Sequence, residues 1–390
     1  MPAGSSKLAP RIESAKLKIT YVCNYRCVMC SYWKSKGQGE LSTGEWRDVI
    51  TDLADMGCGK VHFSGGEPTA RRDWLELVAH AAGLGIRVAM TTNGSLMTSA
   101  DLDELFRLRV RSLSLSFDGP NSRIHDAIRG RRGAFRDNVA LAEEILRMNG
   151  KARRRLRLRV NVVVQAKNYR KVPDMIRLGH RLGAEDVILM PVDAKSAYAE
   201  PGAALSEGRE PLRLSPAQVT EYNRSIRPVV RLLRRELGFR TNRESWDIFG
   251  GDSDASARGE YAAGFYRDHV CFIPWLHTFV GARGDVYLCC MTHNNIEPLG
   301  NVRKDSIRDI FLGKKYDATR SSFLRNRLAI CGRCDQYLAE NRAWAREFGI
   351  QDPSKSVGSS PSPGTPVRPG APGSSRRSKA DRSEGVKEES

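Results

Sequence analysis

The feature that most constrains the fold is a regular alternation of short β-rich apolar runs with longer helical patterns between residues 15 and 193. The runs that have the composition of strands are Leu17–Tyr21, Lys60–Ser64, Arg87–Thr91, Ser112–Ser116, Arg157–Val164 and Asp186–Met190. The helical patterns between them are Thr43–Met56, Asp73–Leu84, Ser99–Leu108, Phe135–Met148 and Val172–Leu182. Strands that alternate with helices are typical of parallel sheets. The sequence therefore predicts an α/β fold, specifically a partial, TIM-like (β/α)6 barrel.

The remaining chain divides by composition. We expect an N-terminal arm over residues 1–14, the barrel over 15–193 and a linking segment over 194–265, which includes a helical stretch from Pro216 to Leu237. A compact region with several cysteines, 266–350, is expected to form a small α+β domain. The tail, 351–390, is rich in Ser, Pro and Gly and has almost no large apolar residues, so we predict that it is disordered.

The amino-acid composition bears on the compartment in which the protein works and on its partners. Hydrophobic residues make up 40% and charged residues 28%, and no apolar run approaches the ~20 residues of a membrane helix. The N-terminus lacks the apolar stretch of a secretory signal, so we expect a cytoplasmic protein with reduced cysteines and no membrane partner. The net charge is +18, and Lys151–Arg159 holds six basic residues in nine. Such a run is usually a solvated face, and a nucleic-acid partner is not expected.

The first cysteine cluster lies directly after the first predicted strand, in the sequence CNYRCVMC. Cys23, Cys27 and Cys30 would sit on a loop at the active-site face of a barrel. Three thiolates cover three irons of a cubane cluster and leave one iron open to bind a cofactor or substrate. A zinc site would need a fourth Cys or His at short spacing, and the first histidine after Cys30 is His62.

This C-x3-C-x2-C spacing before a barrel pattern resembles the radical S-adenosylmethionine superfamily. FSGGEP, at Phe63–Pro68, is similar to the family motif that contacts the amino group of S-adenosylmethionine. By itself the motif is a strand-ending turn whose glycines permit close backbone approach. Asp118 could instead cap the next segment. The resemblance implies these cofactor-binding residues: Gly65, Gly66, Glu67, Pro68, Asn93, Ser116, Asp118 and Asn161.

The same resemblance implies a mechanism. A reduced 4Fe-4S cluster would pass one electron to S-adenosylmethionine, and the resulting deoxyadenosyl radical would remove a hydrogen atom from the substrate. An electron donor such as flavodoxin or ferredoxin is the expected partner. The protein would orient the reactants and exclude water.

A second, four-cysteine set lies further along the chain, at Cys271, Cys289, Cys331 and Cys334. Four cysteines could bind zinc as readily as iron. Behind a radical domain, their spacing resembles the twitch domain, the shorter relative of the SPASM domain. The resemblance implies a second, fully ligated 4Fe-4S cluster that accepts an electron. This layout is similar to aminocyclitol dehydrogenases of antibiotic biosynthesis, so we expect an oxidoreductase acting on a small hydroxylated molecule.

Other functions stay open at this point. The chain could be a maturase of a ribosomally made peptide, a sugar epimerase, decarboxylase or dehydratase, or a non-enzymatic iron–sulfur or zinc scaffold. Alternation along a strand would turn Cys290 away from Cys289, where its thiol could donate hydrogen in an epimerase. Gln165 and Asp193, with Lys195, are positional candidates for a general base. Cys58 is expected to be a buried structural side chain.

Overall fold

The computed structural model describes residues 9–192, 212–239, 248–250, 252–261, 265–325, 328–334 and 338–347. All of these lie in one compact unit, Met1–Asp352; the second unit is Pro353–Ser390. The predicted disordered tail, 351–390, lies outside the described residues, as do Asp193 and Lys195.

A single sheet runs through the compact unit, with the strand order β6-β5-β4-β3-β2-β1-β7-β8-β9. The first six strands are parallel neighbours, as predicted for a partial barrel. Their bounds are β1 Ser14–Thr20, β2 Lys60–Gly65, β3 Arg87–Thr92, β4 Ser112–Ser116, β5 Arg157–Val164 and β6 Asp186–Pro191. Both α/β class and barrel are therefore confirmed.

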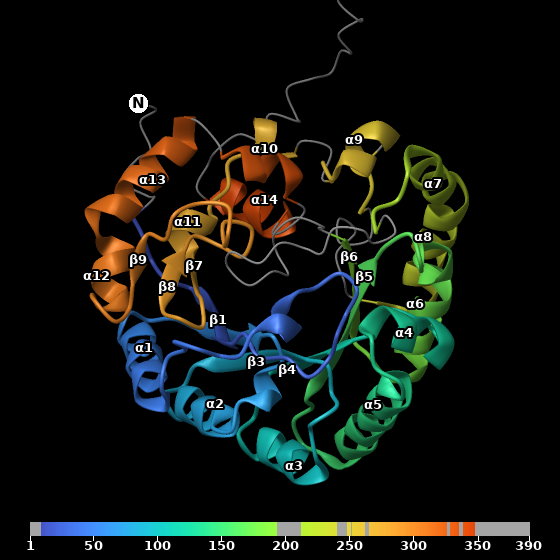
Figure 1. Ribbon diagram of the computed structural model, residues 1–390, viewed down its shortest axis with the longest axis horizontal. Coiled ribbons are helices and arrows are strands. Elements are labelled where there is room, and N and C mark those ends of the chain that lie inside the picture. The colour runs from blue at the N-terminus through green and yellow to red at the C-terminus, as the bar shows by residue number, and fades with distance from the viewer. Residues whose placement is uncertain are drawn as a thin grey trace, which may run out of the picture. The chain divides into compact units, whose positions relative to one another are not determined.

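Helices surround this sheet (Figure 1). The predicted ones are α1 Thr43–Asp55, α2 Trp74–Gly83, α3 Ser99–Arg107, α5 Ala134–Lys151 and α6 Val172–Arg181. Sequence analysis missed α4, Ser122–Arg129, which begins at the side-chain cap of Asn121. Two of its three buried residues, His125 and Arg129, are polar, so its buried face has little apolar signal.

The described residues of the predicted linking segment are partly helical. They contain α7 Pro216–Glu221, a π-helical turn Tyr222–Ile226, α8 Arg227–Glu236 and α9 Ser253–Arg258. Helix α8 packs against α6, and Val219, Tyr222 and Val230 join the main hydrophobic core. This segment therefore adds to the helical layer as well as connecting the two cysteine regions.

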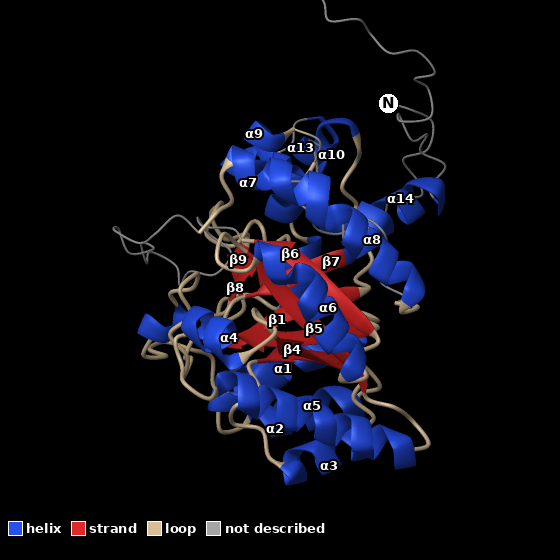
Figure 2. Cartoon of the chain, turned by 90° about the vertical axis from the view of Figure 1, so that its right-hand side faces the viewer, coloured by secondary structure: helices blue, strands red, loops and turns tan. Residues whose placement is uncertain are grey.

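The C-terminal region continues the barrel sheet. Strand β7, His277–Val280, pairs in parallel with β1, and β8 Asp285–Tyr287 and β9 Gly300–Asn301 follow in antiparallel order. The remaining elements are α10 Phe265–Asp268, α11 Ile273–Leu276, α12 Ile307–Leu312, α13 Lys314–Arg325 and α14 Leu338–Glu347. Figure 2 shows strands β7, β8 and β9 beside the barrel strands. The expected α+β domain is confirmed, and it shares its sheet with the barrel. No described helix has the length and apolar character needed to cross a bilayer.

Candidate active site

One cavity, of about 230 Å³, lies where the parallel strands end. Its walls come from the loop after β1, from the ends of β2 to β6 and from the C-terminal region. The lining includes all three cysteines of the first cluster, together with Gly65, Gly66, Glu67, Asn93, Ser116, Asn161 and Cys290. Cys23 and Cys290, which are 267 positions apart in the chain, therefore face a common space.

The two glycines at the end of β2 lie against the loop between β1 and α1, residues 21–42, which carries Cys23, Cys27 and Cys30 and is called the cluster loop here. They allow this loop to approach the sheet closely. A Cβ on Gly66 would lie 2.3 Å from the Val22 carbonyl oxygen, and one on Gly65 would lie 2.1 Å from the Thr20 oxygen. Gly65 also has φ +149°, a conformation that glycine tolerates best. The backbone amides of Gly66 and Glu67 donate to the carbonyls of Thr20 and Val22, at 2.8 Å each. The glycines of the FSGGEP motif therefore permit a close approach between this motif and the cluster loop.

Glu67 connects the ends of β2 and β3. Its carboxylate accepts hydrogen bonds from the hydroxyls of Thr69 at 2.7 Å and Thr92 at 2.6 Å, and from the Asn93 amide at 2.7 Å. The side chain is buried, and burial raises its pKa. Asn93 in turn donates to the Asn24 amide oxygen at 2.8 Å, on the cluster loop. Glu67 therefore positions three strand-end segments around the cavity.

A buried ion pair stands behind the first cysteine cluster. Nε of Arg129 lies 2.7 Å from the Asp118 carboxylate, and its Nη1 lies 3.8 Å from the Cys27 sulfur. Burial by itself lowers the pKa of Arg129, but the interactions with Asp118 and Cys27 raise it by more. The net pKa lies above the ordinary value, so the guanidinium stays charged. Asp118 also accepts from the Val163 amide at 2.8 Å. Asn121 caps α4, so the capping alternative for Asp118 is wrong.

Lys18 brings a buried amine to the cavity wall. Its Nζ bonds to the Tyr32 hydroxyl and lies 4.2 Å from the centre of that ring. Burial, together with the nearby charge of Lys16, lowers the pKa of Lys18 to about 7. Burial also raises the pKa of Cys23 and of Cys30 to about 12. These thiols are therefore costly to ionise without a positively charged guest.

The second cysteine set surrounds a separate small cavity. Cys271, Cys289, Cys331 and Cys334 all line it, beside Tyr266 and Met291. Cys290 instead lines the first cavity, together with the first cysteine cluster. The two adjacent cysteines thus face different cavities, as alternation predicted, although they follow β8 in a bend.

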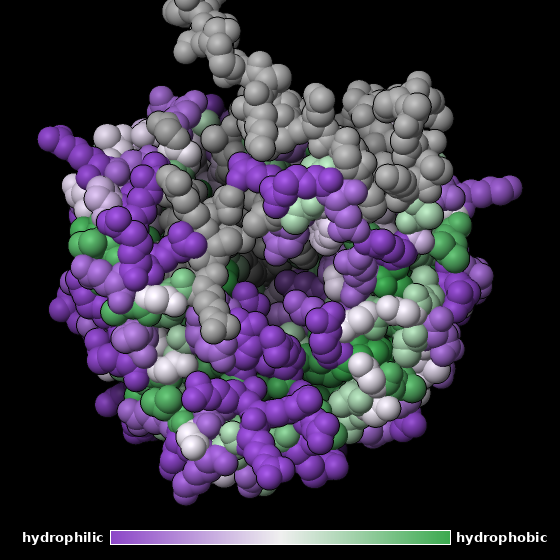
Figure 3. Space-filling model, turned by 180° about the vertical axis from the view of Figure 1, so that it is seen from behind, coloured by the Kyte–Doolittle hydropathy of each residue, from purple (hydrophilic) through white to green (hydrophobic). Residues whose placement is uncertain are grey.

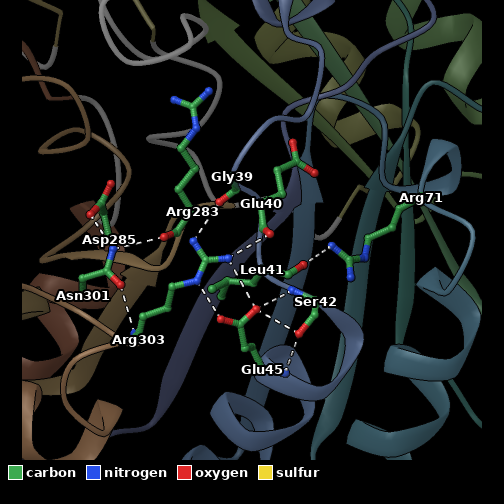
Figure 4. A network of polar contacts seen from close by, with 10 residues as sticks. All are labelled: Gly39, Glu40, Leu41, Ser42, Glu45, Arg71, Arg283, Asp285, Asn301 and Arg303. Atoms are coloured by element: carbon green, nitrogen blue, oxygen red, sulfur yellow. Dashed lines mark hydrogen bonds and ion pairs between the residues drawn. The ribbon is translucent and has the colours of Figure 1, made fainter.

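The cluster loop is anchored to the C-terminal region by the network in Figure 4. Arg303, after β9, donates to the Gly39 and Glu40 carbonyls at 3.0 and 2.9 Å and to the Glu45 carboxylate at 2.6 Å. Arg71 donates to the Leu41 carbonyl at 2.8 Å from the barrel side. The loop that carries the cysteines is therefore fixed from two sides.

Three predicted site residues do not line the cavity. Pro68 begins a short 3₁₀ turn, Asp118 lies behind the wall, and Gln165 is fully buried elsewhere. Asp193 lies outside the described residues. Sequence reasoning missed Lys18, Tyr32, Arg129 and Arg333, which all line the cavity. Lys16 and Lys18 alternate with apolar residues in β1 and both line the cavity, so this period-2 pattern was a signal available in the sequence.

The donor sets suit iron–sulfur clusters in their chemistry, because cysteine thiolates are the usual ligands of such clusters. The first set offers three thiols and the second four. Across the described residues, no three His, Cys, Asp or Glu side chains are arranged to hold a single metal ion.

Two family models match the chain. The Radical SAM superfamily model matches residues 17–178, and the SPASM iron–sulfur cluster-binding domain model matches residues 271–335. The two matches contain the first and second cysteine sets respectively. The predicted division into a radical domain and an auxiliary-cluster domain therefore has independent support.

Curated relatives include PqqA peptide cyclases and heme synthases. The PqqA peptide cyclase of Bradyrhizobium diazoefficiens is 35% identical over 171 residues, 43% of each chain. The AdoMet-dependent heme synthase of Methanosarcina barkeri is 34% identical over 178 residues, 45% of this chain and 49% of that protein. The chain spans less than half the length of the first of these relatives. The expected likeness to aminocyclitol dehydrogenases is not supported by these relatives.

The longest of these similarities is to the PqqA peptide cyclase of Xanthomonas euvesicatoria, 30% identical over 310 residues, 78% of this chain and 75% of that protein. Among solved structures, anSMEcpe with bound AdoMet has a TM-score of 0.59 at 18% identity, covering 83% of this chain and 87% of its own. Streptococcus suis SuiB with precursor peptide SuiA has 0.58 at 15%, covering 85% and 73%. These likenesses show a shared fold. The chain belongs to the radical S-adenosylmethionine superfamily, and its C-terminal region matches the SPASM iron–sulfur cluster-binding domain.

Proposed function

We propose that this enzyme modifies a peptide substrate by radical chemistry, the alternative that sequence analysis ranked behind aminocyclitol oxidation. The observation that carries the proposal is the 310-residue similarity to a PqqA peptide cyclase, because it covers 78% of this chain and 75% of that protein. Solved structures of the same fold include SuiB bound to precursor peptide SuiA and anSMEcpe with bound AdoMet and Kp18Cys peptide.

We assign the two cysteine sets to two iron–sulfur clusters. Cys23, Cys27 and Cys30 would hold the first, with one iron left for S-adenosylmethionine, and Cys271, Cys289, Cys331 and Cys334 would hold the second. When bound, cluster and cofactor together supply a radical that removes hydrogen from the substrate. The predicted cofactor-binding residues that line the cavity would bind and orient the cofactor; they are Gly65, Gly66, Glu67, Asn93, Ser116 and Asn161. A flavodoxin or ferredoxin remains the proposed electron donor.

Lys18 is the best-placed residue to hold or transfer a proton at the cavity. Lys18 lines the cavity together with Cys30 and Cys290, and its Nζ is hydrogen-bonded to the Tyr32 hydroxyl. It replaces Gln165 as the candidate base, since Gln165 does not line the cavity. Lys18→Arg keeps the charge but not the ability to become neutral near pH 7, whereas Lys18→Met removes both.

The test begins with anaerobic reconstitution of the full chain. Iron analysis of the loaded protein should give about twice the iron found in a Cys271→Ala/Cys289→Ala variant, and reduction with S-adenosylmethionine should release deoxyadenosine. Cys27→Ala should abolish deoxyadenosine release. If Cys27→Ala keeps the wild-type rate, the assignment of the first cluster is wrong.

The substrate class is tested separately. Candidate peptides and hydroxylated cyclitols are incubated in parallel, and mass spectrometry follows substrate hydrogen loss. Turnover coupled to deoxyadenosine release with a peptide alone supports the proposal. Coupled two-hydrogen loss from a cyclitol, with no peptide turned over, would restore the dehydrogenase prediction. Lys18→Met should lower product yield per deoxyadenosine, and an unchanged yield would remove Lys18 from the reaction.

A further inference from the structure

A third cavity, larger than the two described above, lies at the other end of the sheet, where the parallel strands begin. It has a volume of about 550 Å³. Arg87 and Arg157 are the first residues of β3 and β5, and Arg111 directly precedes β4. The first cysteine cluster follows the opposite end of β1. A strand of seven residues spans roughly 23 Å, so this cavity lies well away from the reacting atoms.

The walls of this cavity are dominated by arginine. The lining consists of Arg87, Arg109, Arg111, Arg154, Arg155, Arg157, Phe106, Val110, Leu156 and Glu185. Part of the basic run Lys151–Arg159, interpreted from sequence as a solvated face, thus borders a concave site. The face of the molecule turned away from the viewer in Figure 1 is largely hydrophilic (Figure 3).

Most of these arginines lack an acidic partner. Arg157 is satisfied, since it pairs with Glu185 at 2.9 Å and with Asp186 at 3.0 Å. Arg87 donates to the Gly59 carbonyl at 2.9 Å. Arg109, Arg111, Arg154 and Arg155 have no ion pair within the described ranges, and all four are exposed. Like charges held around one cavity repel one another, and an anion bound among them would remove that cost.

The backbone at Arg109 supports a role for its side chain. Helices α1, α2 and α6 each end in a glycine with positive φ, namely Gly57 at 80°, Gly85 at 79° and Gly183 at 74°. Helix α3 ends the same way, with the Arg109 amide bonded to the Phe106 carbonyl, but here the left-handed position holds an arginine with φ 56°. A non-glycine residue in this conformation is strained, because its Cβ crowds the following carbonyl oxygen. Among the described barrel helices that end in a left-handed residue, α3 has a non-glycine residue there, and that residue, Arg109, lines the cavity.

We propose that this cavity binds a compact phosphate-bearing ligand, such as an inorganic oligophosphate or the phosphates of a nucleotide. The planar guanidinium fork matches phosphate oxygens with paired hydrogen bonds. The volume lies in the range of about 300–1,000 Å³ typical of small-molecule sites. The site is independent of the proposed peptide substrate, and its ligand need not take part in the radical reaction.

The probe is inorganic triphosphate, because ATP carries an adenosine that could enter the cofactor cavity. Calorimetric titration of the reconstituted full chain should show one saturable site. Arg154→Ala/Arg155→Ala should weaken binding at least tenfold. The matched control, Arg153→Ala/Arg181→Ala, removes the same two charges from exposed positions outside the cavity lining and should change affinity less than twofold. Equal loss in both double variants would overturn the proposal, since it would show only general charge attraction.

Arg109→Gly separates binding from folding. It relieves the left-handed strain, so its thermal midpoint should be equal to or higher than that of the wild type, while triphosphate binding falls several-fold. Unchanged binding in Arg109→Gly would contradict the proposed site. ATP should bind the site as well, and a tenfold preference for ATP over triphosphate that the arginine variants abolish would identify a nucleotide as the source.

Two other classes of ligand are tested in the same titrations. Oligo-glutamate of ten residues and a single-stranded oligonucleotide replace triphosphate. Tighter binding of either one than of triphosphate, lost in Arg154→Ala/Arg155→Ala, would overturn the small-ligand proposal in favour of an acidic peptide or a nucleic acid. Deoxyadenosine release without peptide, measured in the arginine variants, should equal that of the wild type, so a failed peptide assay leaves this result unaffected.

Discussion

At the scale of single residues, the motif glycines are specified by their contacts with the cluster loop. Gly66 faces the carbonyl oxygens of Tyr21 and Val22, which leaves no room for a methyl group. The Gly-Gly-Glu-Pro pattern could be recognised from sequence, and its place at the end of a strand could be inferred. Which backbone approaches the glycines could not, because that contact joins segments more than 40 positions apart.

Gly66→Ala should therefore disturb the loop that carries Cys23, Cys27 and Cys30. We expect a loss of about 1–3 kcal/mol in the free energy of unfolding, together with reduced iron content, since the new Cβ would meet rigid backbone. Denaturant unfolding followed by circular dichroism measures the first effect. Gly83→Ala in α2 is the matched control, because a Cβ there meets nothing within 4 Å. Gly66→Ala and Gly83→Ala with equal stability would contradict this account.

The buried pair Arg129–Asp118 offers a second prediction at this scale. Asp118→Ala should cost about 3–5 kcal/mol, because it leaves the Arg129 charge buried beside Cys27 without its carboxylate. Adding Arg129→Met should recover much of that loss, as the uncompensated charge is then gone. Thermal and denaturant unfolding measure both. Asp174→Ala, in an exposed pair with Arg177, should change stability by about 0.5 kcal/mol or less.

At the scale of elements, the sequence predicted the strands and helices of the barrel to within a few residues. The period of the hydrophobic residues and the lengths of the segments were sufficient to predict these elements, because six buried strands alternate with amphipathic helices. Helix α4 escaped prediction because it buries a histidine and an arginine in place of a full apolar face. Its last residue is Arg129, so missing the helix also meant missing a residue of the site.

The contact between α1 and the loop after β9 should contribute to acid sensitivity. The hydrogen bond from Arg303, with help from Ser42, lowers the pKa of Glu45 to about 2. A carboxylate with a lowered folded-state pKa adds stability above its ordinary pKa near 4.5 and loses it as the pH falls towards 2. The pair is over a third exposed, so the contribution is about 1 kcal/mol or less after solvent screening.

Glu45→Gln should flatten the fall in stability between pH 5 and pH 2. Denaturant unfolding at several pH values measures the slope. Arg303→Met should flatten it similarly, and the double variant should add little more, since both single changes remove one interaction. An unchanged slope in Glu45→Gln would mean that the contact does not hold in solution.

At the scale of the whole molecule, β7 covers the edge of β1, so barrel and C-terminal region share one sheet. An uncovered strand edge invites pairing with other chains. A chain ending at Tyr261 should therefore be recovered largely as aggregate. A chain ending at Asp352 retains the whole compact unit and should elute as a single peak, free of aggregate, in size-exclusion chromatography. Equal behaviour of the two truncated chains would show that β1 does not need β7.

The sequence by itself determined the α/β class, the two cysteine sets and the radical family, because periodicity and cysteine spacing are local properties that survive without a fold. Only the tertiary structure decided that Cys290 shares a cavity with Cys23, that Lys18 and Arg129 reach it, and that basic residues from the starts of three strands line a larger cavity at the opposite end of the sheet. Those groupings join residues tens to hundreds of positions apart, and sheet order and loop packing bring them together.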